Sequence, residues 1–265
     1  RDVLGSRGLG DVYKRQHIIS LQQRKYRQKF GEYTVEGIRA VTDIGKKDFL
    51  RSILIRESKR SELEPLVQKG FTVSSVYVVQ DPIFDKIEHS VNGQGILGIA
   101  KKCVNDLHSL IVEDGLYVAL DGVQDPGNLG TIIRTAVAAG AKGIFLLKGT
   151  VDPYNEKCVR STMSALCNIP IFEDVTLSEF YDFIKDNTIK TYVTSLENAK
   201  PYHTISYPKR TMIILGNEGN GVSREIIEMC DQTITIPMYG DIESLNVSIA
   251  VSYTHLRAHE TLRHL

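Results

Sequence analysis

The distribution of apolar residues changes character along the chain. From Leu116 onward, short apolar runs alternate with longer stretches in which apolar residues recur every three to four positions. The short runs are typical of buried strands, and the recurring pattern is typical of amphipathic helices. Strands are predicted at "LYVALDGV", "KGIFLLKG", "NIPIFE", "KTYVTSL", "TMIILG" and "QTITIPM", and helices at "NLGTIIRTAVAAG", "NEKCVRSTMSAL", "LSEFYDFIKDN" and "VSREIIEMC". Strands that alternate with helices predict an α/β fold with a mostly parallel sheet and helices on both faces.

The preceding part of the chain predicts a second, smaller α/β domain over residues 17–102. "EYTVEGIRAVTDI" begins as a strand and becomes a helix, and "RSELEPLVQKG" is a helix that Gly70 ends. Further strands are predicted at "RSILIRE", "SSVYVVQ" and the glycine-broken "VNGQGILGIAKK". Residues 103–115 are predicted to be a linker, and residues 116–251 form the larger domain.

The two ends of the chain differ from the rest. The first sixteen residues lack a periodic apolar pattern, and the last fourteen are polar and histidine-rich. "GLGDVYKRQ" and "SYTHLRAHET" resemble translated sequencing-adaptor sequence. We therefore expect residues 1–16 and 252–265 to be non-native and the natural chain to continue beyond Val251 with other residues. His255 and His259 have a spacing that can bind metal on a helix, but we expect no metal.

Charge is balanced over the chain but uneven locally. The formal net charge is zero, which argues against a protein that binds nucleic acid through bulk charge. The segment "QQRKYRQK", however, places Arg24, Lys25, Arg27 and Lys29 around Tyr26. Such a segment can grip RNA phosphates with a stacking ring among them, and a solvated basic helix is the alternative.

Composition excludes several other classes. The four cysteines form no CxxC pair, so neither a zinc site nor a disulfide framework is predicted. No apolar run approaches the roughly 20 residues that a membrane helix needs, and the first residues lack the apolar core of a signal peptide. We expect a cytoplasmic protein.

Three polar clusters carry the candidate chemistry. In the first, "DGVQDPGNLGTIIRT", a strand ends and a helix is predicted to start near Asn128, a preferred capping residue. Arg134 lies six residues further on a mostly apolar helix. It is either a functional group or an arginine at the helix edge with a buried stem.

The second cluster is the glycine loop "LGNEGNG", between a strand and a helix. No Lys-Ser or Lys-Thr follows the glycines, which excludes a P-loop, and Glu218 would repel phosphate. The loop therefore suits a cation, a sugar hydroxyl, an amino group or a guanidinium, unless Glu218 only favours the start of the next helix.

The third cluster is "IPMYGDIESLNVSIA". A strand is predicted to end at Met238, and Glu243 or Ser244 to cap a new helix. Ser244, Asn246 and Ser248 then lie at the helix start, where they can bind a ligand or simply cap the backbone.

Together and in this order, "NLGTIIRTA", "LGNEGNGVS" and "IPMYGDIESLNVSIA" resemble the three signature motifs of the SpoU (TrmH-like) branch of the SPOUT RNA methyltransferases. "GEYTVEGIRAV" and "QGILGIAKK" resemble the L30e-like substrate-binding domain that many of these enzymes carry. The resemblance implies a SPOUT fold with a C-terminal trefoil knot, a homodimer and S-adenosylmethionine as cofactor. The reaction it implies is methylation of a ribose 2′-hydroxyl in RNA, with rRNA favoured over tRNA.

The resemblance also implies the site residues. The matching polar site positions are Asn128, Arg134, Glu218, Ser244 and Asn246, and the cofactor-binding positions are Gly216, Ile236, Leu245 and Asn246. We expect bare backbone at Gly216 to approach the cofactor, and Glu218 to engage Asn128 or Arg134.

Arg134 matches the family's key residue, and its role stays open. A guanidinium is a poor base by itself because its pKa lies above about 12. It can clamp an RNA phosphate, stabilise the developing alkoxide, or act as a base that the substrate's phosphate activates, as proposed for the family.

Two rival functions remain. One is a non-catalytic RNA-binding relative with the same fold, which the three intact polar clusters disfavour. The other is a nucleotide-binding α/β enzyme of another class, which the lack of a P-loop and of a full GxGxxG disfavours.

The sequence departs from the family after "SLNVSIA". Family members have an apolar helix there, whereas this chain has a polar segment. We expect the chain as given to dimerise and bind cofactor poorly.

Overall fold

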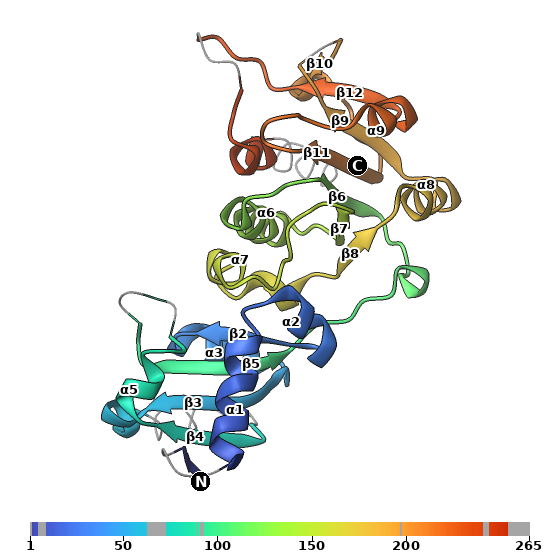
Figure 1. Ribbon diagram of the computed structural model, residues 1–265. Helices are drawn as coiled ribbons and strands as arrows, with labels where there is room; N and C mark the ends of the chain where they lie inside the picture. Colours follow the sequence, from blue (N-terminus) through green and yellow to red (C-terminus); the bar gives the residue numbers. More distant parts are fainter. Residues whose placement is uncertain are drawn as a thin grey trace. The chain divides into compact units, whose positions relative to one another are not determined.

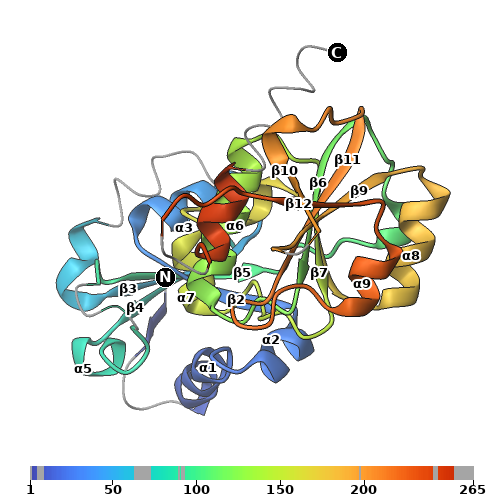
Figure 2. The same ribbon diagram turned by 90° about the horizontal axis from the view of Figure 1, so that it is seen from above.

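The computed structural model describes residues 2–4, 9–62, 73–88, 90, 93–196, 198–240 and 244–253 (Figures 1 and 2). The chain divides into two compact units. Unit 1 comprises residues 1–103 and 154–164, and unit 2 comprises residues 104–153 and 165–265. Within the described residues, no helix has the length and apolar character to cross a membrane.

Unit 1 is a mixed sheet with helices. Its described strands are β1 (Asp2–Leu4), β2 (Glu32–Glu36), β3 (Leu50–Arg56), β4 (Ser75–Val79) and β5 (Ile96–Lys101), in the order β1-β4-β3-β5-β2. Its helices are α1 (Leu9–Ser20), α2 (Arg24–Phe30), α3 (Ile38–Gly45), the 3₁₀ turn η1 (Glu57–Glu62), α5 (Asp81–Phe84) and α7 (Glu156–Ser161). The strands predicted from sequence are present. Most of the helix predicted up to Gly70 lies outside the described residues.

One face of the unit 1 sheet packs against α1 and α5. Ile18 from α1 and Leu21, which directly follows this helix, form a buried cluster with Leu54, Leu97 and residues of α5. Burial of these aliphatic side chains is the main stabilising term for a unit of this size. Helix α1 also runs across the boundary predicted at residue 16.

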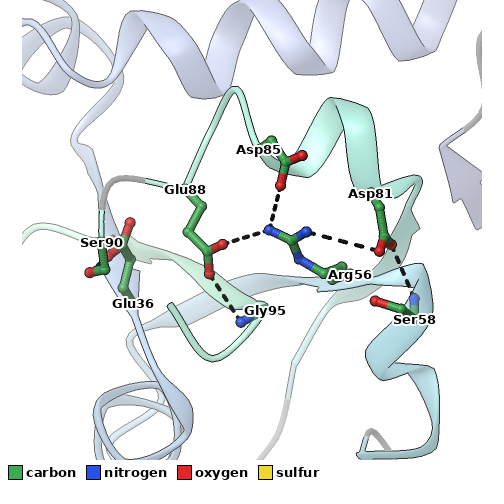
Figure 3. Close-up of polar contacts among 8 residues, drawn as sticks. All are labelled: Glu36, Arg56, Ser58, Asp81, Asp85, Glu88, Ser90 and Gly95. Carbon is green, nitrogen blue, oxygen red and sulfur yellow. Dashed lines mark hydrogen bonds and ion pairs between the residues drawn. The ribbon is translucent and has the colours of Figure 1, made fainter. Parts of the chain in front are cut away.

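Arg56, at the carboxyl end of β3, ties the segment after β4 to the sheet (Figure 3). Its Nη2 lies 2.7 Å from Asp85 Oδ1 and 2.7 Å from Glu88 Oε2, and its Nη1 lies 3.9 Å from Asp81 Oδ2. The guanidinium carbon also lies 5.1 Å from the centroid of the Phe84 ring. Burial opposes the charged form, but the hydrogen bonds to Glu88 and Asp85 outweigh it and raise the pKa of Arg56. A single cation therefore holds three carboxylates together.

Unit 2 is built on a fully parallel sheet. Its seven described strands have the order β10-β12-β9-β11-β6-β7-β8, and every neighbouring pair is parallel. The strands are β6 (Gly115–Asp121), β7 (Gly143–Leu147), β8 (Ile171–Val175), β9 (Lys190–Thr194), β10 (Lys200–Pro201), β11 (Arg210–Gly216) and β12 (Gln232–Thr235). The predicted α/β class and parallel sheet are confirmed. The knot stays a prediction.

Helices cover both faces of this sheet (Figure 2). Helices α8 (Leu177–Asp186) and α9 (Arg224–Met229) lie on one face, and α6 (Pro126–Ala138) lies on the other. Phe180 and Phe183 from α8 and Ile226 from α9 pack with inward-facing strand residues into one buried cluster. The 3₁₀ turns η2 (Leu107–Ser109), η3 (Ala165–Asn168) and η4 (Tyr202–Thr204) complete the unit, and residues 247–253 are helical.

Three boundaries differ from the sequence prediction. Helix α6 begins at Pro126 and is capped by Asp125, whose Oδ1 accepts the amide hydrogen of Asn128 at 2.8 Å. Asn128 was predicted as the cap, but a proline at the first helical position favours the earlier start.

Strand β12 ends at Thr235 and not at Met238. The next helix is capped by Asn246 and not by Ser244, since Asn246 Oδ1 accepts from Ser248 N at 2.9 Å. Glu243 lies outside the described residues.

We predict that Arg56→Met destabilises the protein, because it leaves three carboxylates facing one another without their shared cation. Hydrogen bonds to charged groups contribute about 1.5–3 kcal/mol each when well shielded. These carboxylates are partly exposed, so we expect a total loss near the lower bound, about 1.5 kcal/mol. Urea unfolding measures this loss.

The matched control is Arg39→Met. Arg39 is 78% exposed and pairs with Asp43 across one helical turn at 3.8 Å, so the expected change is below about 0.5 kcal/mol. Equal losses for the two variants would contradict the role of Arg56.

Candidate functional site

The candidate site is built where two neighbouring strands of unit 2 end. Strands β6 and β11 are parallel and adjacent, and Gly216 lies opposite Asp121 in their register. Their carboxyl ends therefore reach the same edge of the sheet, where ligands bind in open α/β folds. The loop after β6 leads to Asn128, and the loop after β11 carries Glu218.

Glu218 links these two loops. Its Oε1 accepts hydrogen bonds from Asn128 Nδ2 at 3.0 Å and from the Asp125 amide at 3.3 Å, and its Oε2 accepts from the Gln124 amide at 3.2 Å. Burial opposes ionisation, but the hydrogen bond from Asn128 and those from backbone amides outweigh it and lower the pKa of Glu218. Glu218 engages Asn128, as the sequence predicted, and is held in its charged form.

Asn246 joins the third segment to the same network. Its Nδ2 donates to Asn128 Oδ1 at 3.1 Å, and its Oδ1 accepts from the backbone and the hydroxyl of Ser248 at 2.9 and 2.6 Å. The side chain of Asn128 thus donates to Glu218 and accepts from Asn246. It connects segments about 90 and 118 residues apart in sequence. Ser244 is exposed beside this network.

Asn217 and Asp121 organise the loops, although the sequence reasoning did not select them. Asn217 and Gly221 exchange backbone hydrogen bonds at 2.9 and 3.0 Å, and Asn217 Oδ1 accepts the amides of Gly219 and Asn220. Asn217 Nδ2 donates to Gly122 O at 2.8 Å, and Asp121 Oδ2 accepts from the Ser223 amide at 2.7 Å. An Asp or Asn residue at the end of a buried strand or directly after it is the signal that could have found both.

The structure gives a second reason for a glycine at position 216, beside the predicted approach to the cofactor, which stays a prediction. A Cβ atom there would lie 2.1 Å from the carbonyl carbon of Gly221 and 2.2 Å from the Val222 nitrogen. Side-chain rotation cannot relieve a clash between backbone atoms. Gly216 is therefore required because the chain folds back on itself at this point, whatever ligand lies nearby.

Comparison with known proteins assigns the family. The SpoU rRNA Methylase family model matches residues 115–254, and the MRM3-like substrate binding domain model matches residues 15–98. The 23S rRNA (guanosine(2553)-2′-O)-methyltransferase RlmP of Bacillus subtilis is 33% identical over 89% of this chain and 93% of its own length. The chain belongs to the SpoU rRNA methylase family.

Solved structures agree with this assignment. The AdoMet-bound rRNA methyltransferase from Sinorhizobium meliloti has a TM-score of 0.85 at 30% identity, and the match covers 99% of this chain and 98% of that one. The SpoU methyltransferase AviRb from Streptomyces viridochromogenes, in complex with AdoMet, has a TM-score of 0.86 over 96% and 98% of the two chains. At 23% identity it supports the fold alone.

Arg134 lies on the third turn of α6, beyond the network that fixes the start of this helix. Its side chain is exposed, and it forms no hydrogen bond or ion pair with the described residues. The neighbouring Ile132 and Ile133 are fully buried, so the helix is anchored on its inner side. The side chain of Arg134 therefore lies at the surface of this SpoU family member.

The residues at this edge fit the family's cofactor, S-adenosylmethionine. Glu218 is a carboxylate kept ionised, which suits a cationic sulfonium nearby. Ile236 and Leu245 are half-buried aliphatic side chains in the segments that follow β12 and precede Asn246. They suit the apolar faces of a nucleoside.

The basic segment in unit 1 divides into buried and exposed members. Arg27 is 4% exposed, and its Nη1 donates to the carbonyls of Leu21 and Gln22 at 2.8 and 2.6 Å. Arg27 therefore stabilises the junction of α1 and α2, which corrects its predicted availability to RNA. Arg24 is half-buried, whereas Lys25 and Lys29 are exposed.

We predict that Gly216→Ala disrupts the loop over residues 217–221, because the added Cβ collides with backbone. The expected cost is at least about 2 kcal/mol in the free energy of unfolding, with S-adenosylmethionine affinity reduced at least about tenfold. Denaturant unfolding and calorimetric titration measure these two effects.

Gly219→Ala is the control in the same loop. The nearest atom to a Cβ there is Asn217 Oδ1 at 3.5 Å, an ordinary contact. We expect near-unchanged stability and binding, and a loss as large as that of Gly216→Ala would refute the backbone-clash explanation.

Proposed function

We propose that this chain transfers a methyl group from S-adenosylmethionine to a ribose 2′-hydroxyl of 23S-type rRNA. Membership of the SpoU family and the likeness to RlmP support this substrate class. The observation that carries the proposal is the exposed side chain of Arg134, six residues after Asn128 on the helix that the Glu218–Asn128–Asn246 network anchors.

Different residues of the site bind the cofactor and contact the substrate. The cofactor, when bound, supplies an electrophilic methyl group on a sulfonium. Gly216, Ile236, Leu245 and Asn246 would hold it at the carboxyl edge of the sheet, and the contact between Glu218 and Asn128 fixes the distance between two of the loops there. Ser244, exposed beside Asn246, contacts the substrate ribose. A fixed site of this kind makes the methyl transfer an effectively unimolecular step.

Arg134 acts on the substrate side. A guanidinium binds phosphate oxygens in a planar, bidentate geometry. We assign it the contact with a phosphate of the target nucleotide, which orients the 2′-oxygen and stabilises the charge that develops on it. The proton of the hydroxyl leaves to that phosphate or to solvent.

Helix α2 supplies a second RNA contact, in unit 1. Tyr26 and Phe30 are stacked with ring centroids 6.1 Å apart. Lys25 lies 5.8 Å from the Tyr26 ring and Lys29 lies 5.4 Å from the Phe30 ring. These ammonium groups, with Arg24 beside them, grip phosphates.

The natural protein is proposed to be a cytoplasmic homodimer. On the helix over residues 247–253, Ile249 is 49% exposed, whereas Val247 and Val251 are buried. An exposed aliphatic side chain on the outer face of this helix suits a second copy of the chain. We keep residues 17–102 as the substrate-binding domain, residues 116–251 as the methyltransferase domain, and the two ends as non-native.

We predict that Arg134→Ala lowers methyl transfer to unmodified rRNA at least about 100-fold, with little change in stability because the side chain is exposed. Transfer of a radiolabelled methyl group from S-adenosylmethionine measures this, with the natural C-terminus restored. Arg224→Ala is the control, since Arg224 is 88% exposed and pairs only with Glu228 one turn away among the described residues. An inactive unsubstituted chain, or equal rates for the two variants, would sink the proposal.

A further inference from the structure

Unit 1 contains a cavity that lies apart from the methyltransferase motifs. Its volume is about 280 Å³, and it opens at the amino ends of the parallel strands β3 and β4, where Ser52 pairs with Ser75. Its wall also includes His17 from α1 and Glu32, the first residue of β2. All of its described lining residues fall within the range predicted to be native.

One side of the cavity is apolar and aromatic. Leu54 and Ile99 form part of it, and both belong to the buried cluster under α1. Tyr77 of β4 lines the cavity, packs against this cluster and is half-buried. Such a surface accepts a flat, weakly polar ring and offers little to a simple ion.

The other side is polar and carries paired charges. Glu32 is 14% exposed, and its two oxygens contact His17 Nε2 at 2.8 Å and Arg51 Nε at 3.0 Å. An ionised carboxylate has about four lone-pair sites, so Glu32 can accept further hydrogen bonds while it keeps both partners. Arg51 is 50% exposed and, among the described residues, pairs with Glu32 through its Nε, so its terminal nitrogens can donate to a ligand at the rim.

The cavity adjoins the basic helix α2 through a chain of ring contacts. The His17 ring meets the Phe30 ring edge-on at 4.5 Å, and Lys29 lies 5.4 Å from that same Phe30 ring. A phosphate held by Lys29 would therefore lie near the mouth of the cavity. One nucleotide could then place its phosphate on α2 and its base inside.

We propose that this cavity receives one unpaired nucleobase of the RNA substrate, an inference that rests on the function proposed above. The base stacks on Tyr77 above the apolar floor, and its edge donates to Glu32 and accepts from Arg51. Proteins read unpaired RNA bases by this combination of stacking and edge hydrogen bonds. Guanine presents two adjacent N–H groups to a carboxylate and an acceptor to a guanidinium, so guanine is the preferred base over uracil.

The test is the affinity of the full chain for fluorescently labelled single-stranded RNA that contains guanine, compared with an all-uracil strand. Tyr77→Leu is expected to weaken guanine-RNA binding about tenfold, within the range for loss of one stacking contact. Glu32→Gln is expected to remove most of the preference for guanine over uracil. Arg39→Ala, on α3 and outside the cavity lining, is expected to change the affinity less than about twofold.

A second variant tests the cavity without altering its core, so that a loss of binding is not due to misfolding. Ser74 is an exposed lining residue in the loop before β4, so Ser74→Trp should close the mouth without touching the core, and should weaken guanine-RNA binding as Tyr77→Leu does. Melting temperatures confirm that each variant is folded. Folded Tyr77→Leu and Ser74→Trp with unchanged RNA affinity would overturn the proposal.

Two further readouts separate the alternatives. GMP binding that the variants abolish, with RNA affinity unchanged, would assign the cavity to a free nucleotide and overturn the RNA proposal. Failure of the proposed function shows differently, as no methyl transfer by the unsubstituted chain. If both proposals hold, Tyr77→Leu raises the KM for RNA about tenfold and leaves kcat within about twofold, whereas Arg134→Ala lowers kcat.

Discussion

The candidate site depends on the side-chain amide of Asn128. It donates to Glu218 and accepts from Asn246, so one group ties together the loop after β6, the loop after β11 and the segment before the last described helix. An amide suits this position because it offers a donor and an acceptor at once. Glu218 in turn accepts hydrogen bonds from the backbone amides of Gln124 and Asp125. These bonds fix the start of α6, the helix that carries Arg134.

The parallel sheet makes this arrangement possible, and the sequence was sufficient to predict it. Alternating apolar runs and amphipathic stretches predicted strands whose carboxyl ends share one edge. We also expected Glu218 to engage Asn128 or Arg134, and the structure shows the contact with Asn128. The family, the cofactor and the methyltransferase activity followed from the same three motifs, and the comparisons confirm them.

What the sequence missed depends on contacts between distant segments. Helix α6 begins at Pro126, two residues before Asn128, and Asp125 is its capping residue. The crowding at Gly216 comes from the return of the chain at Gly221 and Val222, which no local pattern reveals. The sequence pattern suggested that Arg27 is an exposed cation among other cations. In the structure it is buried, and its guanidinium donates to two backbone carbonyls in the turn after α1. The cavity beside Glu32 is lined from four strands and a helix, so its residues are scattered along the chain.

The most direct test of the account is the methyl-transfer rate of Asn128→Asp at neutral pH, with the natural C-terminus restored. This substitution keeps the size of the side chain but turns the donor that faces Glu218 into a second carboxylate, and like charges at this distance repel. We predict a loss of at least about tenfold in the rate with the fold intact, whereas Thr131→Ala, on the exposed face of the same helix, stays close to the unsubstituted rate. A folded Asn128→Asp variant that transfers methyl groups at the unsubstituted rate would contradict the central claim that this amide holds the site together.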